Sequence, residues 1–258
     1  MFEIKNLCVG YSGRTVSRDI SLSVPDGQVT VILGPNGCGK STLLKGLCGI
    51  LPVMSGEATL HGESLLGLPP RKLAQKVAYL AQSRRVPDIT VQRLVLHGRF
   101  PYLSYPRRYR KEDYLAAQTA MEQMHIADLA DKSLESLSGG QRQKVYIAMA
   151  LAQNTQVILL DEPTTYLDVA HQLQMMRQAK ALSAEGKIVV MVLHDISLAL
   201  QTADQIVLMN QGRVVTAGTP EAVFETGALD RVFGVKIGRI QTEQGWHYYY
   251  QEGTYEPV

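Results

Sequence analysis

The chain has 258 residues, 45% hydrophobic and 19% charged, so it is long and apolar enough to form a large domain with a buried core. Its net charge of +2 does not indicate a nucleic-acid-binding protein, and its three cysteines fit neither a disulfide framework nor a zinc site. The long apolar runs have the length of β-strands, so we expect that any work at a membrane requires another chain to cross it.

The N-terminal part of the chain is expected to form antiparallel β-structure. Residues 2–9 and 20–24 alternate apolar and polar side chains, and Pro25-Asp26-Gly27 turns the chain toward the next strand. We place Tyr11 on a turn after the first strand. Its ring either stacks on an adenine or is an ordinary surface side chain, and the local sequence leaves both open.

A glycine-rich loop between a strand and a helix is the most informative stretch. Residues 29–33 are β-branched and apolar, and the leucines of residues 43–47 have helical spacing. The loop between them fits G-x-x-x-x-G-K-[ST], in which backbone N–H groups and a helix start hold phosphate. The residues expected to contact nucleotide are Gly34, Pro35, Asn36, Gly37, Cys38, Gly39, Lys40, Ser41 and Thr42.

Three side chains of this loop carry specific expectations. Lys40 is placed to reach the β- and γ-phosphates, and the Ser41 hydroxyl is placed to ligate Mg²⁺. Cys38 lies close to a helix start, where a thiolate is favoured, so we expect its alkylation to block ATP binding.

The middle of the chain changes from β to helical character. The strand over residues 77–81 ends at Gln82, which either reaches a ligand from the strand end or is a surface glutamine. Thr90 is a possible N-cap, and a second helix is expected over residues 112–125. Before it lies a basic run that either meets phospholipid headgroups or a partner, or is a solvated helix start: Arg107, Arg108, Arg110 and Lys111.

A second loop followed by a helix contains Ser138, Gly139, Gly140 and Gln141. Such a helix start is a potential second phosphate site, and the alternative is that Ser138 simply caps the helix.

Two carboxylates follow the apolar run of residues 157–160. Asp161 can hold Mg²⁺, and Glu162 can orient or deprotonate a water for attack on the γ-phosphate. His194 follows another apolar strand, residues 187–193, and either stabilises charge at the γ-phosphate or is structural. Residues 236–258 are expected to form a terminal hairpin whose tyrosines serve packing.

With these motifs in this order, nearly the whole chain resembles the ATP-binding cassette (ABC) ATPases. The resemblance implies that residues 34–42 are the Walker A loop, that Tyr11 stacks on adenine, and that Gln82 senses Mg²⁺ and the membrane partner. It also implies a signature sequence at residues 137–141, a Walker B aspartate at Asp161, a catalytic glutamate at Glu162, a D-loop at Asp168 and a switch histidine at His194. The expected activity is therefore Mg²⁺-dependent ATP hydrolysis.

The expected fold is α/β, a P-loop NTPase core with a mainly parallel sheet, an N-terminal antiparallel β-subdomain and an inserted helical subdomain. We expect the ATPase domain to span residues 1–235. Its core comprises residues 1–89 and 156–235, its helical subdomain residues 90–155, and a C-terminal hairpin tail residues 236–258.

The resemblance also implies the partners. Two copies would pair head to tail, with ATP between Walker A of one copy and residues 138–140 of the other, and with Asp168 near the shared site. The pair would dock on transmembrane permease subunits at the cytoplasmic face of a bacterial-type membrane, together with a separate substrate-binding protein and without nucleic acid.

Two short stretches, residues 98–102 and 164–172, look like those of importers of metal chelates. They predict an ATPase for iron-siderophore import, with haem or cobalamin as alternatives. A soluble ABC ATPase is the remaining alternative, although the chain has one cassette and no long heptad run. Import itself, as opposed to export, is implied only by this finer resemblance.

Overall fold

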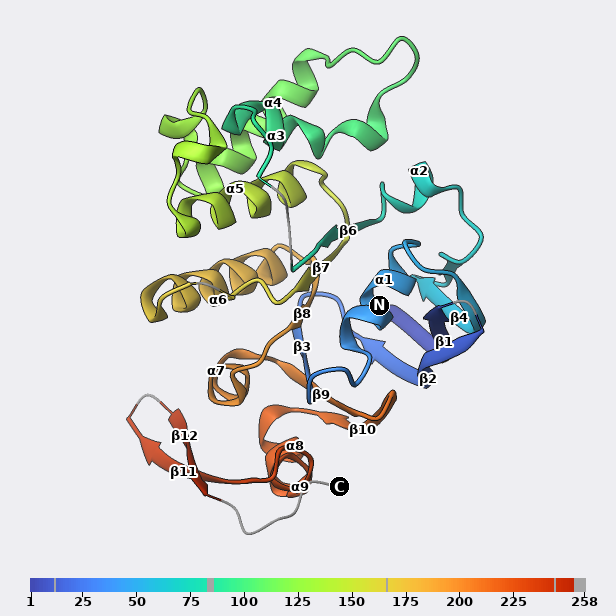
Figure 1. Ribbon diagram of the computed structural model, residues 1–258, viewed down its shortest axis with the longest axis vertical. Helices are drawn as coiled ribbons and strands as arrows, with labels where there is room; N and C mark the ends of the chain where they lie inside the picture. The colour runs from blue at the N-terminus through green and yellow to red at the C-terminus, as the bar shows by residue number, and fades with distance from the viewer. Residues whose placement is uncertain (12, 83–85, 166, 244, 253–258) are drawn as a thin grey trace. The chain divides into compact units, whose positions relative to one another are not determined.

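The computed structural model describes residues 1–11, 13–82, 86–165, 167–243 and 245–252 (Figure 1). Contacts between residues divide the chain into two compact units. The phosphate-loop unit comprises residues 1–67 and 178–258, and the helical unit comprises residues 68–177.

The phosphate-loop unit begins with an antiparallel sheet. β1 (Phe2–Tyr11) pairs with β2 (Arg14–Val24) and β4 (Val53–Leu60), and β4 pairs with β5 (Glu63–Ser64). The antiparallel start predicted from sequence is therefore confirmed. The predicted turn position of Tyr11 was wrong, because β1 continues to Tyr11, which pairs with Arg14. Ser12, in the expected turn, lies outside the described residues.

A second sheet in the same unit is mainly parallel. β3 (Val29–Leu33) lies between β8 (Ile188–Val192) and β9 (Gln205–Asn210), parallel to both, and β10 (Arg213–Gly218) pairs antiparallel with β9. Every residue of β3 and β8 is buried, which explains why these strands are continuous apolar runs. The helix α1 (Lys40–Leu47) follows β3 after the glycine loop.

Among the described residues, the C-terminal part of this unit also contains short helices and a hairpin. The helices are α7 (Ile196–Thr202), α8 (Pro220–Glu225) and α9 (Ala228–Phe233). The hairpin is formed by β11 (Val235–Thr242) and β12 (Gly245–Glu252), and β12 lies against α7 (Figure 1).

The helical unit contains a pair of parallel strands and a cluster of helices. β6 (Val77–Leu80) pairs with β7 (Val157–Asp161). The helices α3 (Val91–His97), α4 (Lys111–Gln123) and α5 (Gly139–Ala152) pack on one another (Figure 1). The remaining elements are α2 (Pro70–Leu73), the 3-10 turns η1 (Phe100–Tyr102), η2 (Ala127–Leu129) and η3 (Leu134–Ser136), and the first part of α6 (Val169–Ala184).

These elements confirm the predicted α/β architecture of parallel strands, an antiparallel sheet and a helical segment. The helical unit also contains β6 and β7, and the boundaries proposed at residues 89/90, 155/156 and 235/236 stay predictions. Within the described part of the chain, no helix combines the length and hydropathy needed to cross a membrane.

Candidate active site

The phosphate loop joins β3 to α1 with a backbone that requires glycine. Gly34 has a φ of 153°, and a Cβ there would lie 2.2 Å from the carbonyl oxygen of Met209 and 2.7 Å from Cys38 Sγ. A side chain at this position would therefore force the loop away from β9. The glycine that the motif predicted is required here by packing as well as by its dihedral angle.

Two neighbouring segments hold the loop in place. Ser17 of β2 is fully buried and its hydroxyl donates to the Gly39 carbonyl oxygen at 2.9 Å. The backbone N–H of Gly212, in the turn between β9 and β10, donates to the Cys38 carbonyl oxygen at 3.0 Å. Both residues were missed from sequence, because the partners lie far along the chain and nothing local distinguishes Ser17 from other serines of β2.

The side chain of Lys40 folds back onto the backbone of the phosphate loop. Its side chain is 5% exposed, and its ammonium donates to the carbonyl oxygens of Gly34 at 2.6 Å and Pro35 at 2.9 Å. A buried ammonium needs such partners. The positive charge is therefore held inside the loop predicted to bind phosphate.

Cys38 differs from its prediction. Its thiol is buried, and this burial raises the pKa above its ordinary value although Lys40 Nζ lies 3.9 Å from the sulfur and acts in the opposite direction. The expectation that the thiolate is favoured was wrong, because desolvation outweighs the nearby positive charge.

His194 lies two residues after the end of β8, in the same unit as the loop. The N–H of Leu193 donates to the Ile32 carbonyl oxygen at 3.3 Å, which fixes the carboxyl end of β8 beside that of β3. His194 is exposed there, and ligands of open α/β sheets bind at such strand ends. Tyr11, at the end of β1, is also exposed.

In the helical unit, Asp161 is the last residue of β7 and Glu162 follows it, so the acid pair lies at a strand end as predicted. Asp161 is 2% exposed and accepts a hydrogen bond from Tyr79 Oη at 2.9 Å. Glu162 accepts from Nε2 of Gln82, which follows the neighbouring strand β6. The structure therefore brings Gln82 and the acid pair together at the ends of two parallel strands, whereas Tyr79 was not predicted.

Glu162 is also fixed by its backbone and by the following turn. Its φ of 51° is unusual for a residue with a side chain, and such conformations occur at functional sites. Thr165 Oγ1 donates to Glu162 Oε2 at 3.3 Å. Gln143 Nε2 of α5 donates to the Pro163 carbonyl oxygen at 2.6 Å, so a second unpredicted side chain links this turn to the signature helix.

The signature segment begins α5 with a reciprocal cap. Ser138 Oγ accepts from the Gln141 N–H at 3.2 Å, and Gln141 Oε1 accepts from the Ser138 N–H at 3.0 Å. The alternative that Ser138 is an N-cap is therefore confirmed as local geometry. This cap aligns the N–H groups of Gly139 and Gly140 at the helix start, so it is compatible with a phosphate role, which stays a prediction.

Asp168 lies near this helix start. Its carboxylate accepts from the His171 backbone N–H at 2.9 Å and contacts His171 Nδ1 at 2.7 Å, and these bonds hold the pKa of Asp168 below its ordinary value. A Cβ on Gly140 would lie 3.6 Å from the His171 ring. His171 therefore connects the predicted D-loop to the signature glycines. Tyr166, between the acid pair and Asp168, lies outside the described residues.

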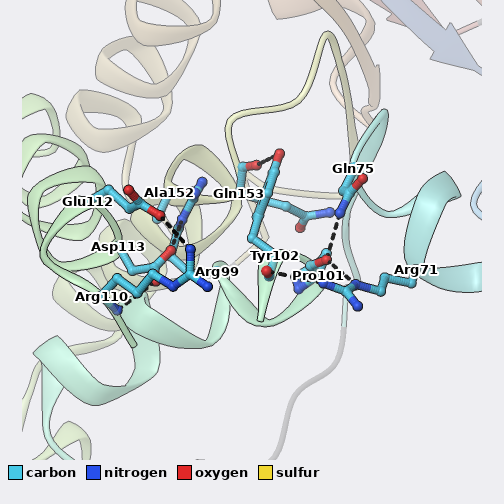
Figure 2. A network of polar contacts seen from close by, with 10 residues as sticks. All are labelled: Arg71, Gln75, Arg99, Pro101, Tyr102, Arg110, Glu112, Asp113, Ala152 and Gln153. Atoms are coloured by element: carbon cyan, nitrogen blue, oxygen red, sulfur yellow. Dashed lines mark hydrogen bonds and ion pairs between the residues drawn. The ribbon is translucent and has the colours of Figure 1, made fainter. Parts of the chain in front are cut away.

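A polar network around η1 fixes the other end of α5 (Figure 2). Arg99 Nε contacts Asp113 Oδ1 at 3.0 Å in a largely buried ion pair, and Arg99 Nη1 donates to the Ala152 carbonyl oxygen at 3.0 Å. Tyr102 Oη donates to the Gln153 carbonyl oxygen at 2.9 Å. The last turn of α5 is therefore tied to η1 and α4.

The same network reaches the start of β6. Gln153 Nε2 donates to the carbonyl oxygens of Ala74 at 2.5 Å and Val77 at 3.2 Å. A Cβ on Gly98 would lie 2.1 Å from the Met149 carbonyl oxygen, so only glycine allows this approach to α5. The stretch of residues 98–102, which suggested metal-chelate importers, thus has a structural role in joining α5 to the strand that precedes Gln82.

The comparisons with known proteins agree with this geometry. The family model described as ABC transporter matches residues 17–165. The ferric enterobactin transport ATP-binding protein of Escherichia coli (strain K12) is 40% identical over 234 residues, which cover 90% of this chain and 86% of that protein. The hemin import ATP-binding protein of Rhodococcus jostii (strain RHA1) is 41% identical over 236 residues, covering 91% of this chain and 80% of that protein.

A solved structure of an ABC transporter is similar in fold to this chain. A metal-chelate type ABC transporter in an inward-facing conformation matches with a TM-score of 0.84 at 26% identity, and the match covers 98% of each chain.

A glycine loop that holds a buried lysine, and a pair of acids at a strand end, define a nucleotide-hydrolysing P-loop protein. The chain belongs to the ABC transporter family and is an ATP-binding ATPase of that family. ATP-binding subunits of this family dimerise and work with transmembrane permease partners, as components of membrane transporters.

Proposed function

We propose that the chain hydrolyses Mg–ATP to power a membrane importer of metal chelates, and that its cargo is an iron-siderophore complex. The observation that carries the cargo assignment is the 40% identity to a ferric enterobactin transport protein over 90% of the chain. The residues of the loop and the acid pair support the hydrolysis.

Glu162 is the proposed catalytic base. Gln82 and Thr165 both hydrogen-bond Glu162 Oε2, which limits the positions that the carboxylate can take. A carboxylate held in one position can orient and deprotonate a water for in-line attack on a γ-phosphate. His194 is the proposed partner that stabilises charge on that phosphate.

The nucleotide would be held by the backbone N–H groups of residues 34–42 and by the ammonium of Lys40. Tyr11 is the proposed adenine-stacking side chain, and its exposed ring is compatible with that role. In a head-to-tail dimer, the second copy would contribute its signature segment, Ser138 to Gln141, together with Asp168.

Each residue proposed as an Mg²⁺ ligand carries an oxygen donor. Ser41, Gln82 and Asp161 offer a hydroxyl, an amide and a carboxylate oxygen, the ligand class that Mg²⁺ prefers. Bound Mg²⁺ would neutralise phosphate charge. For that role, the Tyr79 hydroxyl would hold the buried Asp161 in one orientation.

The proposed assembly consists of two copies of this chain on the cytoplasmic face of a permease, with a separate substrate-binding protein delivering the cargo. Binding of ATP would close the pair and hydrolysis would open it, a population shift driven by the ligand.

Uptake into cells tests the cargo directly. A strain in which this chain is deleted would be complemented with the wild-type chain or with Glu162→Gln, and supplied with radiolabelled ferric siderophores, haem or cobalamin. We expect the wild-type chain to restore uptake of a ferric siderophore, and Glu162→Gln not to restore it. Uptake restored equally by both variants would contradict the proposal that hydrolysis drives transport.

Haem is the second candidate cargo, because the hemin import relative is 41% identical to this chain. In the same panel, restoration of haem uptake without siderophore uptake would replace the first candidate by the second. Cobalamin uptake alone would exclude both. None of these outcomes changes the assignment of the chain as an ATPase.

A further inference from the structure

The C-terminal hairpin contacts the segment that follows His194. Tyr250 Oη of β12 accepts a hydrogen bond from the Ser197 backbone N–H at 2.7 Å and lies 3.1 Å from Asp195 Oδ1, to which it donates. Ser197 Oγ donates to the Tyr248 carbonyl oxygen at 2.9 Å. Tyr248 and Tyr250, and the residues that they contact, all belong to the phosphate-loop unit. In this unit β12 lies beside α7 (Figure 1).

These contacts complete the cap of α7. Asp195 Oδ1 accepts the Leu198 N–H at 2.9 Å, as an N-cap does, and the tyrosine hydroxyl satisfies the Ser197 N–H. Burial raises the pKa of Tyr250 to about 12, so the hydroxyl keeps its proton at physiological pH and continues to donate to Asp195. The start of α7 is thus held by a side chain from 55 residues away.

His194 lies between two fixed neighbours. On one side, Leu193 is tied to Ile32 at the end of β3, from which the phosphate loop begins. On the other side, Asp195 is tied to Tyr250. Anchors on both sides limit the freedom of the His194 backbone, so they influence where its imidazole lies relative to the loop.

We infer that Tyr250 is a positioning residue for His194, through which the C-terminal hairpin maintains the rate of ATP hydrolysis. The inference rests on the proposed role of His194 at the γ-phosphate. Tyr250 itself does not touch the nucleotide in this scheme, since it acts through Asp195 and the backbone between them.

A matched pair of tyrosines makes the test specific. Tyr250→Phe removes one hydroxyl and keeps the ring, whereas Tyr249→Phe makes the same change on the opposite face of β12. The Tyr249 ring lies over Gly238 of β11, where a Cβ would come within 2.3 Å of Tyr249 Cζ. Tyr249→Phe therefore controls for the loss of a tyrosine hydroxyl from the same strand, whereas the loss of His194 positioning should occur only in Tyr250→Phe.

Steady-state ATP hydrolysis by the full chain is the main measurement. We expect Tyr250→Phe to lower kcat by about fivefold with KM for ATP unchanged, the size expected for one lost hydrogen bond. Tyr249→Phe should remain at the wild-type rate. The imidazole resonances of His194 in NMR spectra should shift in Tyr250→Phe and not in Tyr249→Phe.

A double variant separates this inference from the proposed function. His194→Ala should be slow, and adding Tyr250→Phe to it should lower kcat no further, because both changes act at one point. Wild-type turnover in His194→Ala would overturn the proposed role of His194 and the inference with it. A slow His194→Ala together with a normal Tyr250→Phe, or with an additive double variant, would overturn the inference alone.

Discussion

In the proposed function the phosphate loop binds the nucleotide and the acid pair activates water, and these two segments are built in different ways. The loop is a contiguous run of nine residues whose conformation depends on its own glycines and on the bonds of Lys40 to Gly34 and Pro35. The acid pair depends on side chains from other parts of the sequence, since Gln82 reaches Glu162 across 80 positions and Tyr79 reaches Asp161 across 82.

This difference predicts different responses to mutation. A change in the loop should act mainly on nucleotide affinity, because backbone N–H groups and one charge are the proposed binding groups. A change around the acid pair should act mainly on turnover, because those side chains hold the proposed catalytic base in position. Each variant below therefore tests which of the two quantities changes.

Glu162→Gln should have the largest effect. The amide keeps the size of the side chain and its contacts with Gln82 and Thr165, but it cannot accept a proton, so kcat should fall by roughly 10²-fold or more. ATP affinity, measured by calorimetry, should stay near the wild-type value. The same change at the exposed Glu185 is the control and should alter neither quantity.

Near-normal turnover in Glu162→Gln would remove Glu162 from the role of base. A fall in ATP affinity as large as the fall in kcat would remove the proposed difference between the acid pair and the loop.

Lys40→Ala should produce the next largest effect, and on binding. It deletes the charge held inside the loop and both of its carbonyl contacts, so the Kd for ATP should rise roughly 10- to 100-fold, as expected for hydrogen bonds to a charged group. Lys45→Ala, in the last turn of the same helix, removes the same charge outside the loop and should bind ATP normally.

Calorimetry with both lysine variants decides the matter. Unchanged affinity in Lys40→Ala would count against the loop as the phosphate site. Equal losses in both variants would indicate general electrostatic attraction rather than a specific contact.

The contrast also explains how much the sequence could predict. Short sequence patterns indicate residues at the junction of a strand or loop with the next element. The phosphate loop, the acid pair, Gln82 and the helix-capping Ser138 all lie at such junctions. Residues that hydrogen-bond a partner brought near only by the tertiary fold could not be predicted in this way. These residues are Ser17, Gly212, Tyr79 and Gln143.

Local patterns also failed where two effects oppose each other. The position of Cys38 at a helix start favours its thiolate, but the packing that buries it is not visible in the sequence. Tyr11 was placed on a turn because glycines flank it, yet pairing with β2 extends the strand through this position.

Tyr79→Phe tests whether the distant partners matter for turnover. It removes the hydroxyl that donates to Asp161 and keeps the ring in β6, so kcat should fall by about threefold to tenfold. Tyr114→Phe, on the exposed face of α4, should have no effect on hydrolysis. An unchanged kcat in Tyr79→Phe would show that Asp161 is held sufficiently by its other surroundings.

Cys38 provides the smallest and most local test, because only the rate of its alkylation is expected to change. Burial raises its pKa, so the thiolate fraction at pH 7 is lower than for an ordinary cysteine, and it grows as pH rises toward that pKa. Iodoacetamide at pH 7 should therefore modify the half-buried Cys8 and Cys48 before Cys38, as followed by mass spectrometry of the peptides.

ATP binding should persist until Cys38 itself reacts, since its sulfur lies 3.9 Å from Lys40 Nζ. Modification of Cys38 first at pH 7 would show that the charge of Lys40, rather than desolvation, controls the thiol, and full ATP binding after its modification would show that the loop tolerates a larger group at this position.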